Sequence, residues 1–155
     1  MKLNIGLAEK SRSGVVEILN RLLADEFVLY AKTRNYHWNV AAPNFSELHK
    51  FFESQYAELE GIVDEVAERA RALGGRALGT LKEYLEVTRL KENPGSNPAA
   101  KRMIAFLLTD HERIIQALRN DLATCQETYQ DAGTSDFLTG LMEQHEKMAW
   151  MLRSF

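Results

Sequence analysis

Among the histidines and acids between residues 37 and 68, five have the spacing that could serve a transition metal: His37, His49, Glu53, Asp64 and Glu68. Imidazole combined with carboxylate suits iron, manganese or zinc. In a helix, His49 with Glu53 and Asp64 with Glu68 are i,i+4 pairs, so the members of each pair share one face. This stretch therefore predicts metal binding through nitrogen and oxygen ligands.

One helix cannot bring these two pairs to the same ion. At a rise of 1.5 Å per residue, His49 and Glu68 are about 28 Å apart, and Glu53 and Asp64 about 16 Å. Yet His49–Glu68 and Glu53–Asp64 share one midpoint, at about position 58.5. Two copies packed antiparallel about a two-fold axis there would place His49 opposite Glu68 and Glu53 opposite Asp64. We therefore expect two equivalent sites at an interface between two chains.

Other interpretations of these side chains stay open. Acidic i,i+4 pairs are common on solvated helix faces, His37 could serve a helix end, and His49 could be a surface residue. A metal site inside a helix bundle needs Glu-x-x-His on two helices, and this motif is absent. His111 and His145 lie in apolar stripes, which predicts hydrogen-bonded core histidines. Cys125 is predicted to be a small buried apolar residue rather than a ligand for haem.

Four helices are predicted to position these residues. Long segments rich in Ala, Leu, Glu, Lys and Arg contain no strand-like alternation, so the fold class is all-α. The expected helices cover 13–40, 44–73, 97–129 and 134–155. Asn44 with Glu47 matches a capping box, Gly74-Gly75 a helix stop, and Pro98 a first helical position.

The apolar stripes and the connections complete the expected fold. About 24 residues separate the second and third helices, and residues 81–87 within them can form a short helix. Short, long and short connections describe a four-helix bundle with one long crossover, the ferritin-like topology. The expected core stripes are Leu48, Phe52, Gln55, Leu59, Ile62, Val66, Ala70 and Leu73, then Ile104, Leu108, His111, Ile115, Leu118, Leu122, Cys125 and Tyr129, and finally Phe137, Leu141, Met148 and Leu152.

Length and composition limit the alternatives. The chain has 155 residues, so we expect a single domain over 1–155. One cysteine excludes a disulfide scaffold and a multi-cysteine zinc or iron–sulfur site. Short apolar runs and an interrupted N-terminal segment predict no membrane span and no signal peptide, hence a cytoplasmic protein. A net charge of −3 gives no indication of nucleic-acid binding.

Several motifs resemble those of the Dps miniferritins, the DNA-binding proteins from starved cells. They are Tyr36-His37-Trp38-Asn39-Val40, Asn44-Phe45 with Leu48-His49, Asp64-Glu65-Val66-Ala67-Glu68-Arg69, and Leu73-Gly74-Gly75. Their spacings match across some forty residues, and the region around Met148-Ala149-Trp150 extends the likeness.

The resemblance implies an activity and an assembly. Such proteins form a hollow dodecamer, oxidise Fe(II) with hydrogen peroxide or O2, and store Fe(III) as mineral, which protects against oxidative stress. No organic cofactor is expected. His37 and His49 match ligands from one subunit, Asp64 and Glu68 match ligands from its two-fold mate, and Glu53 matches a further acid. Trp38 matches a tryptophan that intercepts oxidising equivalents, although packing alone would explain it equally well.

Two further expectations concern iron entry and DNA. Glu127, Asp131 and Asp136 lie where this family has an acidic three-fold pore, which would concentrate cations; an ordinary acidic loop is the alternative. Residues 1–12 contain only Lys2, Lys10 and Arg12 as basic residues, and the C-terminus has no basic extension. Weak or absent DNA binding is therefore expected. The competing functional class is a non-enzymatic nucleoid-associated protein, which would need such tails or an exposed apolar face.

Overall fold

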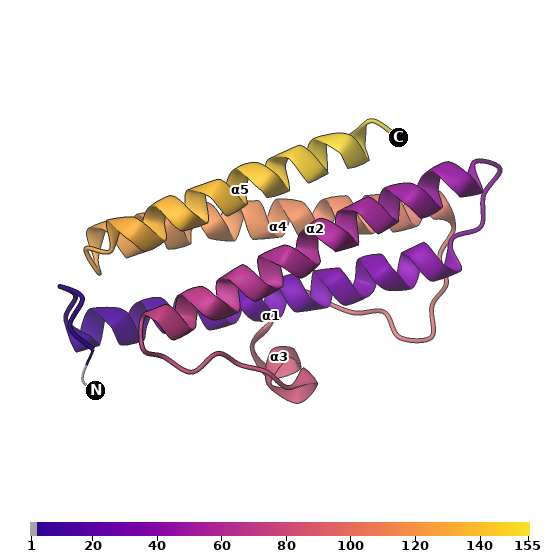
Figure 1. Cartoon of the computed structure of the whole chain (residues 1–155). Helices are drawn as coiled ribbons and strands as arrows, with labels where there is room; N and C mark the ends of the chain where they lie inside the picture. The colour runs from indigo at the N-terminus through magenta and orange to yellow at the C-terminus, as the bar shows by residue number, and fades with distance from the viewer. Residues whose placement is uncertain (1–2) are drawn as a thin grey trace.

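The computed structural model describes residues 3–155, which contain five helices and no strand. The helices are α1 (Glu9–Asn39), α2 (Phe45–Ala72), α3 (Leu81–Val87), α4 (Ala100–Glu127) and α5 (Ala132–Arg153). α1 packs along α2 and α4 along α5, and these two hairpins lie side by side with α3 outside them (Figure 1). The expected all-α bundle with one long crossover is confirmed. Within residues 3–155, none of the helices has the length and apolarity needed to cross a membrane.

The core confirms one predicted stripe and corrects another. Every position of the stripe predicted from Leu48 to Leu73 is buried. In α4 the buried face is shifted, because apolar residues occupy adjacent positions and two helical phases fit the pattern equally well. Packing against the other helices selects one phase. Ile104, Leu108, Ile115 and Leu122 are only half-buried, whereas Met103, Leu107 and Ile114 are buried; in α5, Leu138 is buried in place of Phe137.

The end of α2 is formed as expected. Gly74 has a φ of +83°, which favours glycine. Its N–H donates to Arg71 O at 2.9 Å, and Gly75 N donates to Ala70 O at 3.1 Å. These two bonds make a Schellman motif that satisfies the last carbonyls of the helix.

Two features predicted at helix starts are wrong, although α2 begins directly after Asn44 as expected. The Asn44 side chain makes no capping bond, because its backbone angles of −97° and 38° belong to the tight turn before α2 rather than to an extended cap. Pro98 is not the first residue of α4. The extended residue before α4 is Ala99, whose carbonyl accepts from Arg102 N and Met103 N.

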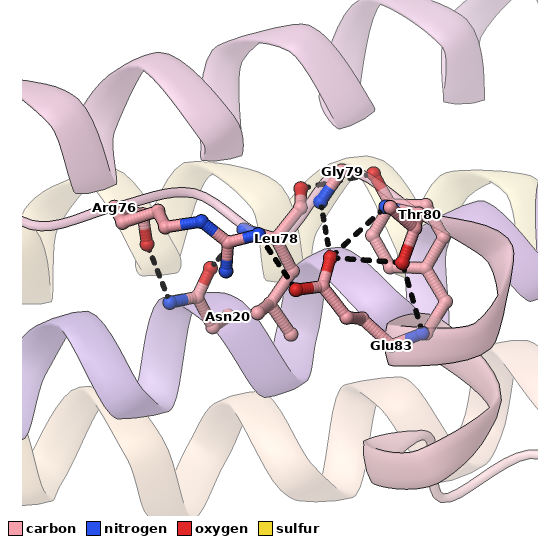
Figure 2. A network of polar contacts seen from close by, with 7 residues as sticks. Asn20, Arg76, Leu78, Gly79, Thr80 and Glu83 are labelled. Atoms are coloured by element: carbon pink, nitrogen blue, oxygen red, sulfur yellow. Dashed lines mark hydrogen bonds and ion pairs between the residues drawn. The ribbon is translucent and has the colours of Figure 1, made fainter.

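A capping box appears instead at the short helix α3 in the crossover (Figure 2). Thr80 Oγ1 accepts from Glu83 N at 3.2 Å, and Glu83 Oε2 accepts from Thr80 N at 3.1 Å. Arg76 Nη2 donates to Glu83 Oε1 at 2.6 Å. This guanidinium, followed by the Gly79 N–H, lowers the pKa of Glu83 to about 2. The cap therefore stays ionised at any ordinary pH.

Polar contacts fasten the crossover to α1. The Asn20 side chain donates to Arg76 O at 2.9 Å and accepts from Leu78 N at 2.9 Å (Figure 2). At the far end of α3, the buried Asp25 carboxylate accepts from Thr88 Oγ1 and from the backbone and side chain of Arg89. These anchors hold α3 against the face of α1 beside α2.

Candidate metal centre

The turn between α1 and α2 brings His37 and His49 into contact. Their rings stack with centroids 3.8 Å apart and planes 22° from parallel. His37 lies in the last turn of α1 and His49 in the second turn of α2, so the short antiparallel connection sets them at one level. His37 is buried, with 7% of its surface exposed, and His49 is half-buried.

The two histidines fix each other's protonation through the backbone. His37 Nδ1 lies 2.8 Å from His49 O, and His49 Nδ1 lies 2.9 Å from His37 O. A carbonyl oxygen can only accept, so each Nδ1 must carry the proton and donate it. Each neutral ring then has its free lone pair on Nε2. This backbone support is the arrangement that orients histidine for binding a metal.

Aromatic and cationic side chains border the histidine pair. The Tyr56 ring lies 5.1 Å from the His37 ring, edge to face, and the Arg34 guanidinium carbon lies 4.9 Å from the Tyr56 ring. The same guanidinium lies 5.5 Å from the Trp38 ring, and Trp38 is 64% exposed. Trp38 thus stands beside the histidines with most of its surface uncovered by its own chain. The sequence alone did not single out Arg34 and Tyr56, because they belong to two helices that only the fold brings into contact.

The carboxylates Glu53, Asp64 and Glu68 are exposed on α2. Asp64 and Glu68 lie about 22 Å and 28 Å along the helix from His49, so the chain does not bring them to the histidines. Within residues 3–155, no group of three or more His, Cys, Asp or Glu is close enough to hold a metal ion. The fold thus joins the two imidazoles, keeps Glu53 one helical turn from His49, and leaves Asp64 and Glu68 far from both.

An apolar groove runs over the outer face of α2. Ala57, Gly61 and Ala67 line it together with Asp64, and α1 and α3 supply its other wall through residues that include Phe27 and Tyr84. A Cβ built on Gly61 would meet no atom within 4 Å. Moreover, α2 spans Phe45–Ala72, so its midpoint coincides with the midpoint of the ligand pairs, about position 58.5.

The three acids expected at a pore differ in their surroundings. Asp131 is buried, with 4% exposed, and caps α5 by accepting from Thr134 N at 3.0 Å and Thr134 Oγ1 at 2.6 Å. Arg69 Nη2 lies 3.5 Å from the same carboxylate. Glu127 and Asp136 are exposed. Asp131 is therefore committed to a helix cap, and only Glu127 and Asp136 have carboxylates free to face solvent.

The two histidines and the cysteine predicted in the core lie there. His111 and His145 are fully buried, and their Nδ1 atoms lie 2.9 Å apart, which confirms two hydrogen-bonded core histidines. Cys125 is buried, and burial raises the pKa of its thiol to about 12. The sequence did not identify Glu26, the buried partner of His145. The available indication was a charged residue on the same helix face as the apolar Leu19, Leu22 and Leu29.

Comparisons with known proteins agree with the geometry. A family model described as a ferritin-like domain matches residues 16–155. The chain is 47% identical over 154 residues to an uncharacterised low temperature-induced protein of a Nostoc species, covering 99% of this chain and 86% of that one. It is 40% identical over 141 residues to DNA protection during starvation protein 2 of Bacillus anthracis, covering 91% and 95%. A Vibrio cholerae Dps structure, described as a member of a superfamily of ferritin-like diiron-carboxylate proteins, superposes with a TM-score of 0.91 at 32% identity, covering 99% and 96%.

Proposed function

Since the chain belongs to the Dps family of ferritin-like proteins, we propose that it is a ferroxidase that stores oxidised iron inside a hollow homo-oligomer. Iron storage and protection are the general role of this family. One observation carries the finer proposal, namely the stacked pair His37 and His49, whose Nδ1 protons are held by backbone carbonyls. Two free Nε2 lone pairs on one small surface are suited to a divalent metal.

The rest of the site comes from a second copy of the chain. Packing two α2 helices antiparallel across the groove about their common midpoint would place Glu68 and Asp64 of one copy opposite His49 and Glu53 of the other. His37 of the other copy is stacked on that His49. Glu53 lies one turn from His49 and is the further acid for a second iron. Small side chains at Ala57 and Gly61 support this contact, because they let two helices approach closely.

Iron is the substrate of the reaction. Two Fe(II) ions each give one electron to hydrogen peroxide, which takes up two protons and leaves as two water molecules. A lone Fe(II) would give peroxide one electron and release a hydroxyl radical, whereas a pair of ions supplies both electrons together and avoids it. The carboxylates favour Fe(III), a hard cation, while the imidazoles retain affinity for Fe(II). O2 is the alternative oxidant.

The assembly and the iron route follow from the same proposal. Twelve chains built from such dimers would enclose a mineral core, with Glu127 and Asp136 lining a cation entry and Asp131 holding the nearby helix end. An acidic opening would raise the local Fe(II) concentration by electrostatic attraction. The site of action proposed is the cytoplasm.

The test uses complementary variants. His37→Ala/His49→Ala and Asp64→Ala/Glu68→Ala should each lose at least about tenfold of the initial rate of ferric absorbance after anaerobic Fe(II) meets peroxide. Glu65→Ala, an exposed acid on the same helix, is the control and should keep the parent rate. Equal rates in the parent and the histidine variant would refute the site.

Mixing the two inactive variants tests whether the site is shared. In a mixed dimer, one site keeps both its histidines and its acids while the other loses all of them. Random exchange of subunits should therefore restore about one quarter of the parent rate. Absence of recovery, with mixing verified by native mass spectrometry, would show that the ligands do not come from two chains.

A further inference from the structure

Three buried titratable side chains form a hydrogen-bonded chain in the middle of the bundle, apart from the metal centre. Glu26 of α1, His145 of α5 and His111 of α4 are each 0% exposed. His145 Nε2 lies 2.8 Å from Glu26 Oε1, and His145 Nδ1 lies 2.9 Å from His111 Nδ1. We call these three residues the core triad.

Each of the two contacts in the core triad requires one proton. Two bare nitrogen lone pairs at 2.9 Å would repel, and two N–H groups would clash, so a single proton lies between the Nδ1 atoms. Likewise, one proton lies between Glu26 and His145. With these two protons alone the triad would carry a net charge of −1 in the core.

A third proton neutralises that charge. Among residues 3–155, His145 is the one charged or titratable partner within ion-pair distance of Glu26. The ammonium of Lys32, the buried lysine of the same helix, is paired with Asp110. A buried, uncompensated carboxylate is strongly unfavourable. Two buried atoms of the triad have no hydrogen-bond partner, Glu26 Oε2 and His111 Nε2. Imidazole is a stronger base than carboxylate, so the third proton belongs on His111 Nε2.

We propose that the core triad holds three protons at neutral pH, as an ionised Glu26, a doubly protonated His145 and a neutral His111, and that it is the acid-sensitive element of the bundle. Imidazole is the stronger base of the Glu26–His145 pair, so it takes the shared proton. Burial, followed by the charge on His145, lowers the pKa of His111 well below its ordinary value. A fourth proton would leave an uncompensated positive charge in the core.

The surrounding helices offer no charge to offset that fourth proton. Besides Glu26, the buried Asp and Lys residues of α1 are Asp25, which is paired with Arg89, and Lys32, which is paired with the buried Asp110 of α4. The buried residues of α2 include no titratable side chain. The polar one among them is Gln55, whose amide donates to Met148 O of α5 at 3.2 Å.

The proton count gives the sign of the pH dependence. Below pH ~6.5 both histidines of the unfolded chain are protonated, so the unfolded chain holds four protons against three in the folded triad, counting Glu26 as ionised. Stability then falls as the pH falls. Between about pH 6 and pH 5 the folding equilibrium constant should drop up to roughly tenfold per pH unit from this source. Above pH ~6.5 the unfolded chain holds two protons, so stability also declines as the pH rises toward the value at which the folded triad releases its third.

His111→Gln tests the proposal on the assembled protein. Without His111, the folded and unfolded states hold the same number of protons below pH ~6.5, so the acid slope of the triad should disappear. The folding equilibrium constant can be measured by urea unfolding at fixed protein concentration and at several pH values between ~6.5 and ~5. For each pH unit of acidification, this constant should fall up to roughly tenfold more in the parent than in the variant. Leu118→Ala, which weakens the same helix face and keeps the triad, should retain the parent slope. Identical slopes in the parent and His111→Gln would overturn the proposal.

A second measurement does not depend on the variant folding. Nitrogen NMR of histidine-labelled, sedimented parent protein at pH 7 should show one histidine with both ring nitrogens protonated, and Glu26→Gln should abolish that signal. If all four histidines are singly protonated at pH 7, the proposed proton count is wrong.

Discussion

At the scale of single residues, the acceptor that faces an imidazole decides what the imidazole can do. His37 and His49 face backbone carbonyls, which fix the proton on Nδ1 and leave Nε2 for a metal. His111 and His145 face one another, and a carboxylate lies beyond them. Four chemically identical side chains thus form the proposed ligand pair at a helix turn and a hydrogen-bonded chain in the core.

Cys125 gives a prediction at this scale. Burial raises the pKa of its thiol to about 12, and the neighbouring Asp131 carboxylate acts in the same direction. Because the thiolate is the reactive form, the native protein should react with a disulfide reagent at pH 8 at least about a hundredfold more slowly than a free thiol. After unfolding in guanidinium, the same protein should react promptly with one equivalent of the disulfide reagent. Fast, stoichiometric labelling of the native protein would contradict this expectation.

At the scale of elements, α2 uses two faces for two purposes. Its inner stripe, which includes Phe52, Leu59 and Val66, fills the core. Its outer face combines small residues with Asp64 and forms the groove beside α1 and α3. The first face makes the bundle, and the second is the surface on which the proposed dimer depends.

Gly61 tests the second face. No atom of its own chain lies within 4 Å of a Cβ at this position, so Gly61→Leu should leave the isolated bundle intact. It should block the close approach of two α2 helices and shift the protein to species smaller than the parent in analytical ultracentrifugation. Gly61→Ala is the matched control, since it adds one carbon and improves helix propensity by about 1 kcal/mol. A Gly61→Leu protein that assembles like the parent would exclude this face as the interface.

Thr80 tests the short helix. Thr80→Ala removes the oxygen that accepts from Glu83 N and should reduce the free energy of unfolding by about 1 kcal/mol. Hydrogen exchange of the amides in Leu81–Val87 should become about fivefold faster, the factor that corresponds to about 1 kcal/mol. In Thr80→Ser the exchange rates should stay near those of the parent. Unchanged exchange in Thr80→Ala would mean that the anchors to α1, rather than the cap, hold α3 in place.

At the scale of the whole molecule, the net charge bears on whether the protein binds nucleic acid. Each chain carries a net charge of −3, which repeats in any homo-oligomer. Of the three basic residues in 1–12, Lys2 lies outside the described residues. Lys10 and Arg12 belong to α1, and Arg12 Nη1 donates to Leu73 O at 3.1 Å. This side chain is engaged within the fold.

We therefore predict no DNA binding at physiological salt. Attraction to phosphates depends on clustered Lys and Arg and weakens steeply as salt rises. In a gel-shift experiment at about 150 mM salt, plasmid should migrate unchanged with the assembled protein, and a Dps with a lysine-rich tail should retard it. A clear shift with this protein would revive the alternative of a nucleoid-associated function.

Local patterns settled most of the fold and half of the candidate site. The helix segments, the Gly74 stop and the inner stripe of α2 follow from backbone propensity and 3.6-residue periodicity, which act over a few residues. The proximity of His37 and His49 follows from the short turn between two long helices. The shared midpoint of the ligand pairs is also a property of spacing alone, and the bounds of α2 match it.

Tertiary structure alone decided the rest. The buried phase of α4, the cap at Thr80 rather than Asn44, and the commitment of Asp131 to a helix end depend on which neighbours supply packing and hydrogen-bond partners. The tautomers of His37 and His49 depend on carbonyls twelve residues away, and the link from Glu26 to His145 spans 119 residues. Such contacts leave no local pattern, because their energy comes from burial and partners that exist only once the bundle has closed.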